Sequence, residues 1–154
     1  MNVMLNHYLD FIKNEKNENL DEINTSNFIS TLAINYKKLE VLSNSSNKVF
    51  IRKNQITRAI MNILDNADKF AEKIFIGSNL VNGKWKIDIE DNGPGTNLSQ
   101  EQLIRPFVKG SDQLNQGTGL GLSIVQKLIK LNNGELSFQK SSYGGLKVTV
   151  ILNT

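Results

Sequence analysis

The sequence contains no cysteine, a single histidine and no long apolar run, and each shortage excludes a class of protein. Without cysteine there can be no disulfide and no thiolate metal site, and one histidine, His7, cannot form a multi-histidine centre. No apolar run approaches the roughly 20 residues that a membrane span needs. The first residues also lack the basic and then apolar pattern of a signal peptide. We therefore expect a cytoplasmic type of chain with no membrane segment of its own.

The net charge is small as well. At +3 in 154 residues, and spread evenly along the chain, it does not indicate a nucleic-acid partner, although it is compatible with an anionic ligand. A composition of 39% hydrophobic and 21% charged residues is that of an ordinary globular protein. The length is sufficient for one domain with its own core.

Apolar residues recur at helical spacing in some stretches and alternate in others, which predicts mixed α and β structure. Helices are expected over residues 1–16, after a capping Ser26, over 54–71, and over 119–131 with its end at Asn132-Asn133-Gly134. Strands are expected near 39–42, 48–52, 73–77, 84–90, through Leu136 and Phe138, and over 146–152. Turns are expected at 43–47, at Asn82-Gly83 and at Gly144-Gly145.

These elements predict an α/β fold, namely a two-layer α/β sandwich with a mixed, mostly antiparallel sheet and helices packed on one face. The polar run 13–19 is expected to be a linker, so that residues 1–19 stand apart from a main domain over 20–154. From Gly93 to Gly117 the apolar residues follow neither a helical nor a strand period. A polar segment of this length inside a small domain is usually functional or mobile.

Residues 91–95, Asp-Asn-Gly-Pro-Gly, follow a strand that places Trp85, Ile87 and Ile89 on one face. Asp91 has the same parity, so the alternation directs a carboxylate into the interior. The same residues also suit a plain turn, since Asn-Gly is a strong hairpin signal and Asp opens turns readily. Taken alone, the segment favours the turn.

The helix expected over 54–71 carries a polar stripe, Asn62, Asn66 and Lys69, along one flank of its apolar face. Asparagine is a poor residue for a helix interior because its side chain competes for backbone hydrogen bonds. Its amide oxygen is a suitable ligand for Mg²⁺, which prefers oxygen and takes few protein ligands besides phosphates and water. A solvated face in an Asn-rich sequence explains the stripe equally well.

Residues 117–122, Gly-Thr-Gly-Leu-Gly-Leu, open the last predicted helix. Glycines at a helix N-terminus let backbone N–H groups approach an anion. The loop is not a Walker A motif, because no Gly-Lys-Ser/Thr follows, and it lacks the preceding strand of a dinucleotide fingerprint. An ordinary helix start is as good an interpretation of these residues alone.

The motifs taken in order resemble the ATP-binding catalytic domains of sensor histidine kinases, in the superfamily that includes gyrase, Hsp90 and MutL. The resemblance covers roughly residues 20–154 and is closest to osmosensor kinases of the EnvZ type. Residues 58–70 resemble the N box, 91–95 the first glycine box, 105–110 (Arg-Pro-Phe-Val-Lys-Gly) the F box, and 117–122 the second glycine box.

The resemblance implies a role for each matching residue. Asp91 accepts a hydrogen bond from the exocyclic amine of adenine, and Asn66 binds Mg²⁺ with Asn62 assisting. Lys69 and Lys109 face the phosphates and, with Asn62, are the implied catalytic residues. An ATP lid lies between Gly93 and Gly117. The other positions expected to bind the nucleotide are Phe70, Gly93, Gly95, Phe107, Gly117, Thr118, Gly119, Leu120, Gly121 and Leu122.

Three positions depart from the family pattern. Ile104 stands where the first phenylalanine of the F box is common, whereas Phe107 fits the second. Lys109 replaces a frequent arginine, which keeps the charge but loses bidentate phosphate geometry. The phosphoacceptor histidine is missing, since His7 lies in a segment resembling the end of the second dimerisation helix and is expected to be structural or exposed.

The implied function is binding of Mg–ATP and transfer of its γ-phosphoryl group to a histidine on a dimerisation domain mostly absent from this chain. The dimerisation domain and a response regulator are the implied partners, and the implied location of the parent protein is the bacterial inner membrane, with this domain on the cytoplasmic side. One alternative is an ATPase or serine kinase of the same superfamily, which has a glutamate base one turn before the metal-binding asparagine. That position is Asn62, which cannot accept a proton. Another alternative is a non-catalytic nucleotide-binding or interaction module.

Overall fold

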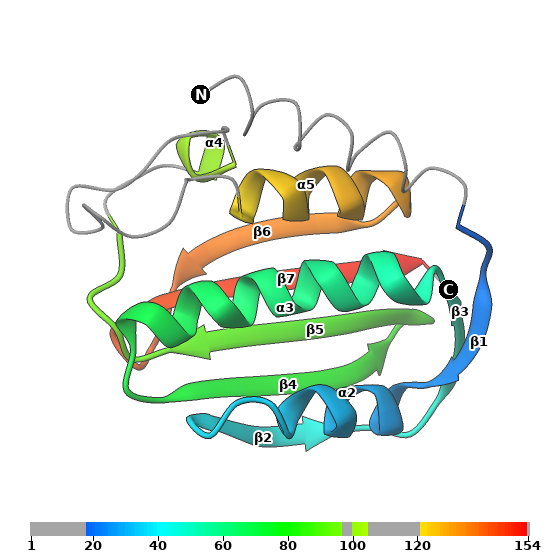
Figure 1. Ribbon diagram of the computed structural model, residues 1–154, viewed down its shortest axis with the longest axis horizontal. Coiled ribbons are helices and arrows are strands. Elements are labelled where there is room, and N and C mark those ends of the chain that lie inside the picture. The colour runs from blue at the N-terminus through cyan, green and yellow to red at the C-terminus, as the bar shows by residue number, and fades with distance from the viewer. Residues whose placement is uncertain (1–17, 97–99, 105–120, 154) are drawn as a thin grey trace.

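The computed structural model describes residues 18–96, 100–104 and 121–153 (Figure 1). The helix expected over residues 1–16 therefore lies outside the described part. The elements, in chain order, are β1 (Asp21–Asn24), α2 (Thr25–Ala33), β2 (Leu39–Asn44), β3 (Lys48–Ile51), α3 (Lys53–Phe70), β4 (Ile74–Val81), β5 (Lys84–Asp91), α4 (Gln100–Leu103), α5 (Gly121–Leu131), β6 (Glu135–Lys140) and β7 (Leu146–Asn153).

A five-stranded sheet forms one layer, in the order β2-β4-β5-β7-β6. Only the β2–β4 pairing is parallel, and the other three are antiparallel. Figure 1 shows α2, α3 and α5 together on one side of this sheet. The predicted two-layer sandwich with a mostly antiparallel sheet is confirmed.

The core lies between the sheet and the helices, and its centre is β5. Trp85, Ile87 and Ile89 alternate inward and are fully buried, as the period of the sequence predicts. Trp85 donates its indole N–H to Ser78 Oγ at 2.8 Å, and its ring meets Phe28 of α2 edge-on. The apolar stripe of α3 covers the same strands. Packing of its inward side chains therefore holds β5 in place, and this fixes the position of its last residue, Asp91.

Several boundaries follow the predicted ones closely. The turn between β4 and β5 has positive φ at Asn82 (53°) and Gly83 (77°), as a two-residue hairpin turn requires. The end of α5 is a Schellman motif, in which Gly134 N donates to Ile129 O and Asn133 N to Lys130 O. The left-handed residue in this motif is Asn133, with φ of 55°, rather than the glycine.

Near the N-terminal end of the domain one expectation is wrong, and two features were not predicted. Asn24, not Ser26, caps α2, with its side-chain oxygen accepting from Asn27 N at 3.0 Å. β1 was not predicted from the sequence; it pairs with β3 in a separate two-stranded sheet. The chain passes from β2 to β3 within the segment 43–47 where a turn is expected, but the two strands lie in different sheets. The same segment binds the start of α2, where Thr25 N donates to Asn47 O.

The first turn of α3 is capped from a distant part of the chain. Arg52, at the N-cap position, makes no side-chain capping bond. The carboxylate of Glu18 accepts from Asn54 N at 2.7 Å and from Gln55 N at 2.9 Å, while Arg52 Nε donates to the Glu18 carbonyl at 2.9 Å. A negative group at this end also suits the helix dipole. The expected linker 13–19 is thus tied to α3 at Glu18.

We expect Glu18→Ala to lower the free energy of unfolding by roughly 1–2 kcal/mol, the usual range for loss of an N-cap. Urea unfolding followed by circular dichroism measures this change. Glu22→Ala is the matched control, because it removes the same charge from an exposed position on β1. An equal loss in both variants would show that the cap contributes nothing.

Candidate functional site

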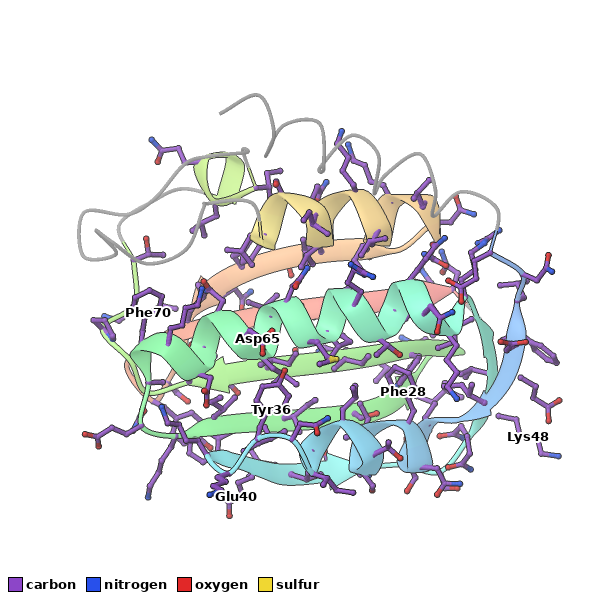
Figure 2. The ribbon with its side chains drawn as sticks, viewed as in Figure 1. Phe28, Tyr36, Glu40, Lys48, Asp65 and Phe70 are labelled. Atoms are coloured by element: carbon purple, nitrogen blue, oxygen red, sulfur yellow. The ribbon has the colours of Figure 1, made fainter. Side chains whose placement is uncertain are left out.

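A pocket opens where the C-terminal half of α3 meets the end of β5 and the start of β7, with α4 on its rim. It combines polar groups from α3 and β5 with apolar walls, and Figure 2 shows Phe70 at this end of α3. Its lining residues are Asn66, Phe70, Asp91, Pro94, Gly95, Thr96, Leu103 and Leu146.

Asp91 forms the floor of the pocket and is 9% exposed. Its Oδ1 accepts two backbone hydrogen bonds, from Gly93 N at 2.9 Å and from Leu146 N at 3.3 Å. Among the described residues, none donates to Oδ2. The backbone therefore fixes the carboxylate through Oδ1. The inward direction that the strand parity predicts is confirmed.

The environment of Asp91 disfavours its ionised form. Burial raises the pKa of the carboxyl above its ordinary value, and the hydrogen bonds from Gly93 and Leu146 offset only part of that rise. A buried carboxylate with a free oxygen is costly unless it is paired or hydrogen-bonded. A ligand that donates a hydrogen bond to Oδ2 would recover part of this cost.

Two glycines make room for Asp91. A Cβ at Gly93 would lie 3.1 Å from both Asp91 Oδ1 and Phe70 O, which is tighter than ordinary contact. A Cβ at Gly145 would overlap Asp91 Oδ1 and come within 2.6 Å of Asp91 O, while Gly145 N donates to that carbonyl at 3.1 Å. From the sequence alone, Gly145 is expected only in a turn. The doubled glycine before the last strand was the one signal of this close approach.

The structure brings some predicted residues together and leaves others apart. Asn66 and Phe70 of α3, half-buried one turn apart, line the same pocket as Asp91 and Gly95. Gly95 has φ of 74°, which favours glycine there. Asn62 and Lys69 lie on the same helix but are not among the lining residues, and Lys69 is exposed.

Some of the residues that the motifs single out after position 100 are described by the structure, and the others are not. Leu122 of α5 is buried, and Gly121, at the first position of α5, has open space where a Cβ would stand. Ile104, at the first F-box position, packs against the hydrophobic core. Six predicted residues lie outside the described part of the chain: Phe107, Lys109, Gly117, Thr118, Gly119 and Leu120.

The part of the chain that the structure describes holds no group of three or more His, Cys, Asp or Glu side chains able to bind a metal. A site built by protein carboxylates alone is therefore not present there. A Mg²⁺ ion that enters with phosphates needs only one or two protein oxygens, and the Asn66 amide on the pocket wall is compatible with that.

None of the helices that the structure describes has the length and apolar character of a membrane span.

Comparison with known proteins gives consistent matches. The model for "Histidine kinase-, DNA gyrase B-, and HSP90-like ATPase" matches residues 51–154. The sensor histidine kinase CpxA of Escherichia coli (strain K12) is 34% identical over 104 residues, which is 64% of this chain and 23% of that protein. The chain therefore spans about a quarter of this relative's length.

Solved structures give the same result for the fold. The histidine kinase AdeS of Acinetobacter baumannii superposes with a TM-score of 0.76 at 22% identity, covering 97% of this chain and 75% of that one. The histidine kinase domain of the E. coli osmosensor EnvZ gives a TM-score of 0.65 at 28% identity, covering 87% and 88%. The structural matches thus include the osmosensor type that the motifs resemble.

We expect Asp91→Asn to stabilise the ligand-free protein at neutral pH. Because the folded-state pKa of Asp91 is raised, this group contributes its full stability below the unfolded pKa of about 3.9. The contribution is lost as pH rises through the folded value. Asparagine keeps an acceptor for Gly93 and Leu146 without the charge. Urea unfolding of both proteins between pH 4 and pH 8 should show an advantage for the variant that grows with pH and then levels off. A constant difference would contradict the buried-charge explanation.

Proposed function

The chain belongs to the family of histidine kinase-, DNA gyrase B- and HSP90-like ATPases, as an ATP-binding domain of the sensor histidine kinase type, and we propose that it supplies the kinase activity of a longer protein. It binds Mg–ATP and presents the γ-phosphoryl group to a histidine on the dimerisation domain of the same parent. The bond from the γ-phosphorus to the bridging oxygen breaks, a bond to the histidine nitrogen forms, and ADP leaves.

The observation that carries this proposal is the floor of the pocket. An ionised aspartate is an acceptor only. Asp91 lines the pocket with one oxygen fixed by two backbone donors, which would leave its second oxygen to accept from a ligand. The exocyclic amine of adenine is a donor that suits this oxygen. Phe70 gives the base an apolar wall, and Gly93 and Gly95 let the chain pass close to the base and ribose.

The triphosphate end of the site needs positive charge, which the polar stripe of α3 would help to supply. Asn66 would bind Mg²⁺, which neutralises charge on the phosphates when bound. Asn62 would assist it, and Lys69 and Lys109 would stabilise the transferring group. The glycines and neighbouring residues from Gly117 to Leu122 would contact the phosphates. Positioning and charge stabilisation of this kind supply most catalysis of phosphoryl transfer.

The residue at position 62 favours a histidine kinase over an ATPase or serine kinase of the same superfamily. An amide cannot take a proton from water or a hydroxyl, whereas a neutral histidine nitrogen is nucleophilic without a base. The names of the relatives, all histidine kinases, agree with this choice. A response regulator would receive the phosphoryl group next, and the parent would hold this domain on the cytoplasmic side of the bacterial inner membrane.

The experiment that tests the proposal supplies the dimerisation hairpin of the parent separately, with γ-labelled ATP and Mg²⁺. We expect an acid-labile, base-stable adduct on the hairpin and none on this chain, since His7 is not expected to be an acceptor. Asp91→Asn should weaken ATP and ADP binding by roughly 1.5–3 kcal/mol, the loss of a hydrogen bond to a charged group. Release of free phosphate alone would indicate an ATPase. Self-labelling that is lost in His7→Gln would overturn the assignment of His7.

A second variant distinguishes a role in binding Mg²⁺ from a role in binding adenine. We expect Asn66→Ala to reduce Mg-dependent phosphoryl transfer at least tenfold while changing metal-free ADP affinity less than about threefold, because the amide is proposed to bind Mg²⁺ and not adenine. Isothermal titration in the presence of EDTA measures the metal-free affinity for ADP, and an assay with Mg²⁺ measures the rate of phosphoryl transfer. Asn79→Ala, on β4 away from the pocket, is the control for a lost surface amide. Equal losses of ADP affinity and of transfer rate in Asn66→Ala would contradict the metal assignment.

A further inference from the structure

Asn92, the second residue of the first glycine box, binds the connection that follows the N-box helix. Its Oδ1 accepts from Glu72 N at 3.0 Å and from Lys73 N at 2.8 Å, and its own N–H donates to Lys73 O at 3.2 Å. These partners form the connection between α3, which ends at Phe70, and β4. One side chain thus satisfies two backbone donors just beyond the helix.

Asp91 and Asn92 are neighbours in sequence but bond to different segments of the chain. Asp91 is bonded to the start of β7, through Leu146 N and Gly145 N. Asn92 is bonded to the connection that follows Phe70. A Cβ on Gly93 would press on Phe70 O, so the backbone after Asn92 already lies against the helix end. The Asn92 side chain therefore links the connection after Phe70 to the residue next to Asp91.

We propose that Asn92 is a positioning residue for nucleotide recognition. Its amide oxygen holds the α3–β4 connection against the turn at 91–93, and this keeps Phe70 and Asp91 at the spacing that a purine ring needs. Asn92 itself does not touch the nucleotide. The inference rests on the proposed function, because the spacing matters only if the pocket takes a base.

The chemistry of this bond predicts which substitutions are tolerated. The two N–H groups need an acceptor at the position of Oδ1. Aspartate provides one with the same reach, and alanine does not. Asn92→Asp should therefore restore what Asn92→Ala loses, although a charge replaces the amide.

Lys38 provides a matched control at the same helix end. Its Nζ donates to Asp68 O at 2.8 Å and to Ala71 O at 2.9 Å, and lies 3.9 Å from Asp68 Oδ1. In the described part of the chain these contacts reach α3 and its end but not the turn at 91–93. Lys38→Met removes a similar number of bonds from the end of α3 and leaves Asn92 in place.

The test uses the whole chain and four proteins: wild type, Asn92→Ala, Asn92→Asp and Lys38→Met. Affinity for metal-free ADP is measured by titration, stability by urea unfolding, and KM and kcat by transfer to the separate dimerisation hairpin. We expect Asn92→Ala to bind ADP about tenfold more weakly. This indirect loss is similar in size to the loss of one hydrogen bond. KM for ATP should rise by a similar factor with kcat unchanged within about twofold, since the groups around the phosphates are intact.

Asn92→Asp should bind ADP within about threefold of wild type, and Lys38→Met should lose stability but not affinity. The proposal is overturned if Asn92→Ala binds ADP as wild type does, if Asn92→Asp fails to restore binding, or if Lys38→Met weakens ADP as much as Asn92→Ala does. Failure of the wild-type protein to bind ADP at all would instead refute the proposed function, so the two failures are distinguishable.

Discussion

The buried carboxylate of Asp91 is the constraint on which the rest of the site depends. The group sits at the end of the central strand β5, where burial raises its pKa. It is held there because β5 pairs on both sides along its length and packs under α3 through Trp85, Ile87 and Ile89. The surrounding backbone comes close enough to bond it only because glycine occupies positions 93 and 145. A destabilising charge is thus tolerated in a rigid setting, as is common where a site must be preorganised.

Helix α3 is the second rigid part, and it is fixed at both ends and in the middle. Glu18 caps its first turn, and Lys38 and Asn92 bind its end. Between them Tyr36 donates to Asp65 Oδ1 at 2.6 Å, a contact visible in Figure 2, and burial together with that hydrogen bond raises the Tyr36 pKa. A helix restrained at so many points carries Asn66 and Phe70 as fixed groups rather than mobile ones.

The period of the apolar residues was enough to predict the sheet, α3 and the inward direction of Asp91, because those features are local and repeat along the chain. Contacts between distant segments were not predictable in this way. Glu18 caps a helix 36 residues ahead, and the Gly145 backbone approaches Asp91 across the β5–β7 register. Neither has a local signature. Asn92 looked like turn chemistry because Asn-Gly is frequent in turns, and its second role appears only once α3 and β5 are placed side by side.

The two helices over the sheet also suit the two kinds of charge in the proposed ligand. α3 and α5 pack against each other and run in opposite directions, so that α3 ends at the side of the sheet where α5 begins (Figure 1). A helix C-terminus carries partial negative charge and favours cations, whereas an N-terminus favours anions. Lys69 lies in the last turn of α3, and the proposed Mg²⁺ beside Asn66 would suit that end, whereas the proposed phosphates near Gly121 would suit the start of α5. In the proposed complex the neutral base would lie at the end of the sheet, where Asp91 is a fixed acceptor for a directional hydrogen bond.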